Sequence, residues 1–371
     1  MTTPRRPHSF SFHLLSWVTL LVGASLIWVG AAVTTTDSGM AFSDWPLSSG
    51  SMNPPGWLSF QPQLLEHGHR IIATLVGLLT LTMFVWQWRE YRQKSLEAAV
   101  LVGVFAAMVG ASSKHVWWVA AVLGAACLIW LVWSLCCRNW PLLLKLTSSA
   151  LILVVAQALL GGARVLKVSD PFGVAHGCLG QLFYCMLIAI ALVSAKGWSG
   201  SECLIEGKKH RWMVILTTLL FTATSMQLLF GAIVRHTQRL ALVATDVLTT
   251  SGHIIPPTDP FNAFSIFMHK SWALVVFTLA MSTAILTWRL FKNQGWLAWL
   301  PKLLVVMPVL QITLGVYVLL TARKFWVTNI HVLNGLLILA VAFVLMVTAW
   351  RSRPMSGLLA QSKRSEQDAS A

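Results

Sequence analysis

Charged side chains are scarce in this sequence. Asp, Glu, Lys and Arg make up 11% of its 371 residues, whereas 56% are hydrophobic. Water-soluble domains carry about a quarter charged residues. A chain of this composition cannot hide its apolar side chains in one soluble core. The scarcity of charge therefore excludes a soluble globular protein and indicates an integral membrane protein.

Cysteine is scarce as well, with six residues in the chain. In the topology described below, all of them fall in membrane spans or on the cytoplasmic side, at Cys127, Cys136, Cys137, Cys178, Cys185 and Cys203. No cysteine is left for the outer side of the membrane. The sequence thus excludes an outer disulfide.

Apolar runs long enough to cross about 30 Å of hydrocarbon recur along the chain. They lie at 12–33, 68–88, 97–113, 116–137, 143–163, 172–194, 212–234, 263–288, 299–321 and 328–349. The first follows Arg5 and Arg6, as in a cleaved signal peptide, but it is longer than a signal core and matches a later helix in a repeat. We expect an all-α membrane protein of eight to ten transmembrane helices.

The net charge of +15 reports orientation rather than affinity for nucleic acid. If the N-terminus is cytoplasmic, eighteen of the 27 Lys and Arg residues lie on the inside and nine on the outside. This distribution satisfies the positive-inside rule. The sequence predicts a multi-pass protein of the bacterial cell (inner) membrane with both termini cytoplasmic, and residues 351–371 form a polar cytoplasmic tail.

Three phrases repeat along the chain: Gln157-Ala-Leu-Leu-Gly161, Gln227-Leu-Leu-Phe-Gly231 and Gln311-Ile-Thr-Leu-Gly315. Each lies in a span that runs outward, and the helix that returns begins with a histidine. These histidines are His176, His269 and His331, and the first span leads in the same way to His69. All four are therefore expected at similar depth, near the outer surface.

The repeat predicts two parallel four-helix bundles, residues 12–194 and 211–350, with His69 and His176 in one and His269 and His331 in the other. Two opposed histidines per bundle are what a six-coordinate haem iron requires. The spans within 97–137 have no counterpart in the second bundle and read as an added hairpin, although 97–113 is short enough to be re-entrant.

A single membrane histidine is more often a hydrogen-bonding residue than a ligand, so only the repeated set is assigned to metal. His67, His115, His236 and His253 have no repeat partner and are expected to be loop or interfacial residues. Glu66 stands three residues before His69 and shares its helical face. It is either a helix N-terminal residue that favours the helix dipole or a functional carboxylate beside a ligand.

Basic residues gather at the outer ends of the helices, where haem propionates would lie. The expected propionate contacts are Arg70, Arg164, Arg235, Lys270 and Arg323, and interfacial anchoring is the alternative for each of them.

These residues resemble the haem A synthase family. The resemblance is carried by the outer-loop sequence from Thr36 to Leu47, by Glu66-x-x-His69-Arg70, by Gln157–Arg164 and by Ala175-His176-Gly177, and it extends through His269 and Asn329-Ile330-His331. It covers most of residues 12–350. Its N-terminal motifs are the more specific ones.

The resemblance implies an enzyme that oxidises the C8 methyl of haem O to the formyl group of haem A. It implies a haem B cofactor on His269 and His331, substrate haem near His69 and His176, and Glu66 as the catalytic residue. Expected partners are haem O, membrane lipid, an unidentified electron acceptor, haem O synthase and a second copy of the chain, but no nucleic acid.

Many bacterial members of this family carry a cysteine pair in the first outer loop, where this sequence has Phe42 and Ser48. Thiol-linked electron delivery is therefore excluded. The alternative function is a di-haem, cytochrome b-like electron-transfer protein that leaves its haem unaltered. A haem carrier or oxidase assembly factor is a third reading, and a transporter is disfavoured because most spans lack a charged residue near the midplane.

Overall fold

The computed structural model describes residues 9–91, 140–198, 204–205, 207–237, 246–259 and 261–354. The chain divides into two compact units, Met1–Trp198 and Ser199–Ala371. The added hairpin predicted at 97–137 and residues 355–371 of the tail lie outside the described residues.

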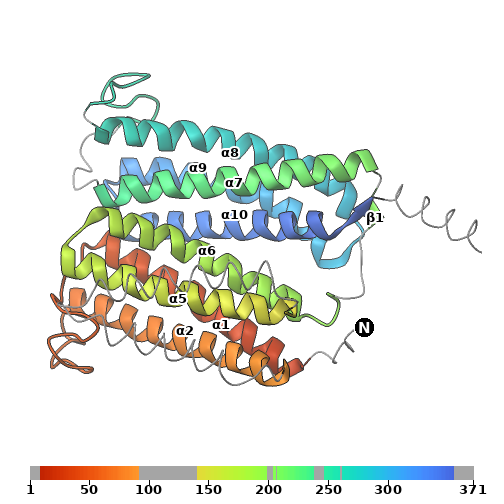
Figure 1. The fold of residues 1–371 in the computed structure, drawn as a ribbon. Helices are drawn as coiled ribbons and strands as arrows, with labels where there is room; N and C mark the ends of the chain where they lie inside the picture. The colour runs from red at the N-terminus through yellow and green to blue at the C-terminus, as the bar shows by residue number, and fades with distance from the viewer. Residues whose placement is uncertain are drawn as a thin grey trace, which may run out of the picture. The chain divides into compact units, whose positions relative to one another are not determined.

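The first unit is a bundle of four described helices. They are α1 (Phe10–Thr35), α2 (Gln61–Tyr91), α5 (Leu142–Lys167) and α6 (Asp170–Ser194), drawn from red to yellow-green in Figure 1. Each helix packs against two others, in the cyclic order α1, α2, α5, α6. A long connection, residues 36–60, joins α1 to α2 at one end of the bundle.

The second unit repeats this arrangement with α7 (Gly207–Thr237), α8 (Phe261–Phe291), α9 (Leu300–Leu320) and α10 (Phe325–Arg351). The cyclic packing order is α7, α8, α9, α10, so α7 corresponds to α1 and α9 to α5. The short 3-10 helix η1 (Gly295–Trp299) precedes α9. Two-residue strands β1 (Leu204–Ile205) and β2 (Arg353–Pro354) pair in parallel.

Eight described helices are long and apolar enough to cross a membrane. They correspond to eight of the ten apolar runs in the sequence. The predicted all-α membrane class is therefore confirmed. Of the residues that the sequence assigned to the tail, Arg351 ends α10 and Arg353–Pro354 form β2.

Tight connections fix neighbouring helices as antiparallel pairs. Between α5 and α6 the chain turns at Val168, which has a left-handed φ of 50°, and α6 begins with a proline in its first turn. Between α9 and α10 the left-handed residues are Ala322 and Arg323, and the Arg323 N–H donates to the carbonyl of Val318 at 2.9 Å.

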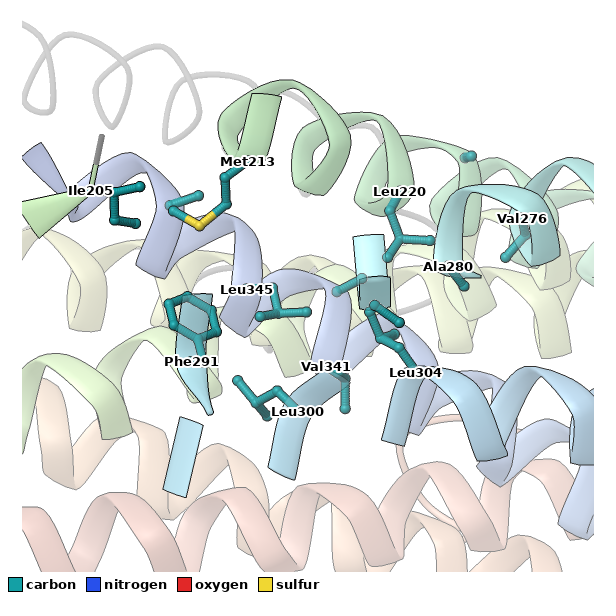
Figure 2. Packing of buried hydrophobic residues seen from close by; sticks show 14 residues of the cluster. Ile205, Met213, Leu220, Val276, Ala280, Phe291, Leu300, Leu304, Val341 and Leu345 are labelled. Atoms are coloured by element: carbon teal, nitrogen blue, oxygen red, sulfur yellow. The ribbon is translucent and has the colours of Figure 1, made fainter. Parts of the chain in front are cut away.

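The core of the second unit combines large and very small side chains. Figure 2 shows Met213, Leu220, Phe291, Leu304 and Leu345 converging from all four helices. Among them lie fully buried alanines, Ala280, Ala284, Ala342 and Ala349. Small residues let helix backbones approach closely, which stabilises helix pairs in lipid, where apolar burial provides little driving force.

Candidate functional site

Each unit brings two of the predicted histidines together. The rings of His69 on α2 and His176 on α6 lie with their centres 6.4 Å apart and their planes at 77°. In the second unit, His269 on α8 and His331 on α10 are also 6.4 Å apart, with an angle of 69°. The two units thus hold two histidine pairs of nearly the same geometry.

This separation fits one iron between two imidazoles. A metal–imidazole nitrogen bond is about 2 Å long and the ring centre lies about 1 Å beyond the nitrogen, so two axial rings have centres about 6 Å apart. Among the described residues, no group of three or more His, Cys, Asp or Glu side chains could hold a metal ion. A pair alone offers two ligands, as a haem iron needs from the protein.

A glycine lies against every one of these histidine rings, a feature that the sequence reading missed. An added Cβ would lie 3.0 Å from the His69 ring at Gly30, and 3.3 Å from His176 at Gly161. The corresponding distances are 3.1 Å at Gly231, to His269, and 3.3 Å at Gly315, to His331. The signal was present, since three of these glycines end the repeated phrases.

The repeated glutamines tie neighbouring helices together at the level of the histidines. The side-chain Nε2 of Gln157 donates to the main-chain carbonyl of His176 at 3.0 Å. Gln227 makes the same bond to His269 and Gln311 to His331, again at 3.0 Å. Four residues before Gly30, the corresponding position in α1 holds Leu26, which has no amide to donate.

Glu66 is buried, with 4% of its surface exposed, and both carboxylate oxygens are engaged. One forms an ion pair with Arg70, and the other accepts a hydrogen bond from the main-chain N–H of Phe42 at 3.1 Å. Helix α2 begins at Gln61 and has no acidic residue in its first turn. Interpreting Glu66 as a helix N-terminal residue is therefore wrong.

Arg70 fastens the connection of residues 36–60, here called the first loop, to α2. Its Nη1 donates to the main-chain carbonyls of Asp44 at 2.9 Å and Leu47 at 2.6 Å. The Asp44 carboxylate accepts from the N–H groups of Ser49 and Gly50, at 2.8 and 2.7 Å, which closes a tight turn. Partial burial alone would raise the pKa of the Asp44 carboxyl, but these backbone N–H donors favour the anion and leave the pKa lowered.

In the second unit a basic side chain also holds the loop, and an aspartate again closes a turn. Lys270 follows His269 as Arg70 follows His69, and its Nζ donates to the carbonyls of Asp246 and Thr249 at 3.1 and 2.7 Å. The Asp246 carboxylate accepts from the N–H of Gly252 at 3.1 Å. In both loops the glycine stands six residues after the aspartate. Arg70 and Lys270 therefore hold loops, and their predicted contacts with propionates stay predictions.

The first loop also packs on α5. An added Cβ at Gly162 would lie 2.5 Å from the Trp45 indole, so only glycine leaves room for this ring. A Cβ at Gly39 would lie 3.4 Å from Nη1 of Arg164. The loop thus contacts the residues next to His69 on α2 and next to Gly161 on α5.

The remaining basic residues predicted at the site are placed at the same helix ends. Arg164 lies in the last turn of α5 and Arg235 in the last turn of α7. Arg323 lies in the turn between α9 and α10.

His67 lies in α2 and is buried beneath residues 42–57, so it is not the loop residue that was one of its two expected placements. It has 5% of its surface exposed, and its Nδ1 is 2.9 Å from the hydroxyl of Ser48. Its ring packs edge-on against Trp57 at 4.7 Å and Phe42 at 6.0 Å. Phe42 and Ser48, which stand in this sequence where a cysteine pair was expected from the resemblance, therefore both contact His67. His253 is exposed in the loop, as expected.

Comparison with known proteins places this arrangement in a family. A protein-family model described as COX15-CtaA, cytochrome oxidase assembly protein, matches residues 115–343, which is more than half of the chain. Three relatives named haem A synthase align over almost the full length. The protein of Lysinibacillus sphaericus is 25% identical over 349 residues, covering 90% of this chain and 95% of the relative. Those of Halalkalibacterium halodurans and Bacillus licheniformis are 23% and 24% identical, covering 86% and 87% of this chain and 90% and 91% of theirs. The chain belongs to the COX15-CtaA family of cytochrome oxidase assembly proteins.

Proposed function

We propose that this protein is a haem A synthase, an oxidoreductase that converts the C8 methyl of haem O into the formyl group of haem A. Family membership and the name of the near full-length relatives support this activity. The observation that carries the proposal is an asymmetry between the units. A carboxylate, Glu66, stands three residues before His69, and the corresponding residue before His269 is Ile266.

The asymmetry supports a reaction in the first unit. His69 and His176 bind the substrate haem there, and the His269 and His331 pair binds haem B in the second unit. A bound haem B supplies a one-electron redox centre. The second pair has Ile266 and Phe267 at the positions of Glu66 and His67, as is suitable for a haem that is not itself modified.

Glu66 is positioned to act on charge that develops at the substrate. Its ion pair with Arg70 and its bond from the Phe42 N–H hold the carboxylate in one orientation. A fixed negative charge in a desolvated site stabilises cationic character at a carbon that is being oxidised, and it can orient a water molecule for attack. We assign Glu66 as the catalytic residue on this basis.

The cations at the outer helix ends complete both sites. Arg164, Arg235 and Arg323 are the proposed propionate contacts, together with Arg70 and Lys270, which also bind loop carbonyls. Guanidinium groups bind carboxylates with two parallel hydrogen bonds, which also fixes the orientation of the ligand.

A di-haem electron-transfer protein is the second candidate, and the near-identical geometry of the two histidine pairs favours it. One experiment separates the two functions. The protein is coexpressed with a haem O source, and the haems extracted from the purified protein are resolved by chromatography. Hydroxylated or formylated haem supports the synthase, whereas unmodified haem alone supports electron transfer.

We place the protein in the bacterial inner membrane with both termini in the cytoplasm, a topology supported by the excess of basic residues in the inner segments. Reporters fused after Ser169 and after Lys196 test it. The first should report an outer and the second a cytoplasmic location. The reverse result would invert the topology. Haem O is the proposed substrate, and the electron acceptor, haem O synthase and a second copy of the chain are the proposed partners.

A further inference from the structure

The four candidate ligands differ in one interhelical hydrogen bond. Three of them, His176, His269 and His331, have a glutamine on the neighbouring helix that donates to their own main-chain carbonyl. His69 is the exception, because the corresponding residue of α1 is Leu26. The missing hydrogen bond is therefore confined to one ligand of one pair.

The hydrogen bond from the glutamine also ties the ligand's helix to the helix on which the histidine ring packs. Each of these glutamines stands four residues before the glycine on which the histidine ring packs. The amide thus locks the backbone of the ligand to the same helix that supports its ring, and it blocks a shift of one helix along the other. His69 also packs on its glycine, Gly30, but a leucine at position 26 leaves α2 free of this side-chain bond to α1.

We propose that His69 is the exchangeable ligand of the substrate haem, that His176 is the permanent one, and that Leu26 sets this difference as a positioning residue. The inference rests on the proposed function. A substrate has to enter and leave its site, whereas a cofactor stays. The glutamine bonds follow that division. In the second unit both histidines accept such a bond, whereas in the first unit only His176 does.

The first loop couples to the same ligand. Arg70, the residue after His69, carries the loop through the carbonyls of Asp44 and Leu47. A displacement of this segment of α2 therefore moves the loop and the exchangeable ligand together. His176 lies on α6, which Gln157 ties to α5.

The test measures haem release from the purified full-length protein loaded with haem O and haem B. Excess apomyoglobin takes up released haem, and chromatography follows the two haem types separately. Wild-type protein should lose haem O faster than haem B. Leu26→Gln should slow haem O release several-fold and leave haem B release unchanged, since one interhelical hydrogen bond in a membrane has an effect of this order. Leu26→Met, of similar size but without an amide, should behave like the wild type.

Removing the existing bonds gives the converse test. Gln157→Leu should speed the release of haem O only, and Gln227→Leu that of haem B only. The ferric spectrum provides a second readout, in which Leu26→Gln raises the low-spin fraction of the substrate haem.

The inference is overturned if Leu26→Gln and Leu26→Met release haem O at the same rate, or if wild-type protein releases both haems equally fast. If Leu26→Gln does not fold, Gln157→Leu and Gln227→Leu test the proposal instead. It is refuted if Gln157→Leu releases haem O, and Gln227→Leu releases haem B, at the wild-type rate. In each of these cases continued haem A formation leaves the proposed function intact, whereas a protein that never oxidises haem O refutes the function itself.

Discussion

Glu66 and Arg70 form an ion pair one helical turn apart on α2, and both also bind the first loop, residues 36–60. The pair lies on either side of His69 in the sequence, so a single turn of helix contains a candidate ligand, a buried carboxylate and the anchor of the loop above them. In the second unit the same turn carries Ile266 and Lys270. The second unit therefore has a cation that binds its loop, Lys270, but no carboxylate at the position of Glu66. A loop of this kind can thus be held without the carboxylate.

Glu66→Gln should reduce the yield of haem A on the order of a hundredfold, while the protein keeps its substrate haem. Glutamine preserves the volume and an acceptor for the Phe42 N–H, but it removes the charge. Haem A yield and total haem content are measured together, with haem O supplied.

Arg70→Gln is the matched control, because it breaks the ion pair and the loop contacts but leaves the carboxylate. We expect it to reduce haem A yield less than Glu66→Gln does. An equal loss in both variants would mean that Glu66 acts only by holding the loop.

His269→Ala and His331→Ala should each eliminate the low-spin haem B spectrum, because each removes one axial ligand. Substrate haem in the first unit should be retained. His176→Ala is the reciprocal variant and should lose haem O while haem B stays. A variant of His269 that binds haem B with an unchanged low-spin spectrum would refute the assignment of this pair.

Much of the fold and of the candidate site could be predicted from the sequence. Hydropathy located the eight described spans, because a membrane helix has to be apolar along its whole length. The repeated Gln-x-x-x-Gly phrases placed three histidines, and the position of His69 followed from the order of the helices. The position of each histidine within the first turns of its helix could be predicted, since it depends only on where the apolar run begins.

What could not be predicted depends on contacts made by loops. The buried position of His67 requires Ser48 and Trp57 to fold back over α2, and no helical periodicity reports this. Arg70 and Lys270 hold their loops by binding main-chain carbonyls. Such contacts cannot be predicted from side-chain patterns, because every residue has a main-chain carbonyl. The first span was expected to belong to the repeat, but its glycine, Gly30, could not be identified from the sequence because Leu26 stands where the other copies have glutamine.

The turn closed by Asp44 should hold at neutral pH and loosen in acid. The N–H groups of Ser49 and Gly50 lower the pKa of its carboxyl below the ordinary value of 3.8 against the opposing effect of burial. A lowered pKa in the folded loop means that the stabilisation is present above pH 3.8 and is lost as the pH falls through the folded-state pKa. Amide hydrogen exchange at Gly50 measures this. Asp44→Asn should show the faster exchange already at neutral pH, and equal exchange in both proteins would contradict the role of the carboxylate.

The glycines behind the histidines give the most local test of the two sites. Gly231→Ala adds a methyl 3.1 Å from the ring of His269, and Gly161→Ala adds one 3.3 Å from the ring of His176. Neither ring can simply move away, because Gln227 and Gln157 tie the backbones of these histidines to the helices that carry the glycines. The overpacking should cost about 1–3 kcal/mol, and it should appear as reduced retention of haem B in Gly231→Ala and of haem O in Gly161→Ala.

Gly77→Ala on α2 is the control, because an added methyl there meets no atom within 4 Å and helix propensity favours alanine by up to about 1 kcal/mol. Haem content, resolved by type, is measured in all three variants. Equal haem B retention in Gly231→Ala and Gly77→Ala would mean that the His269 ring does not need this glycine. Loss of both haems from either site variant would indicate general unfolding and would contradict the prediction that each glycine serves the histidine of its own unit.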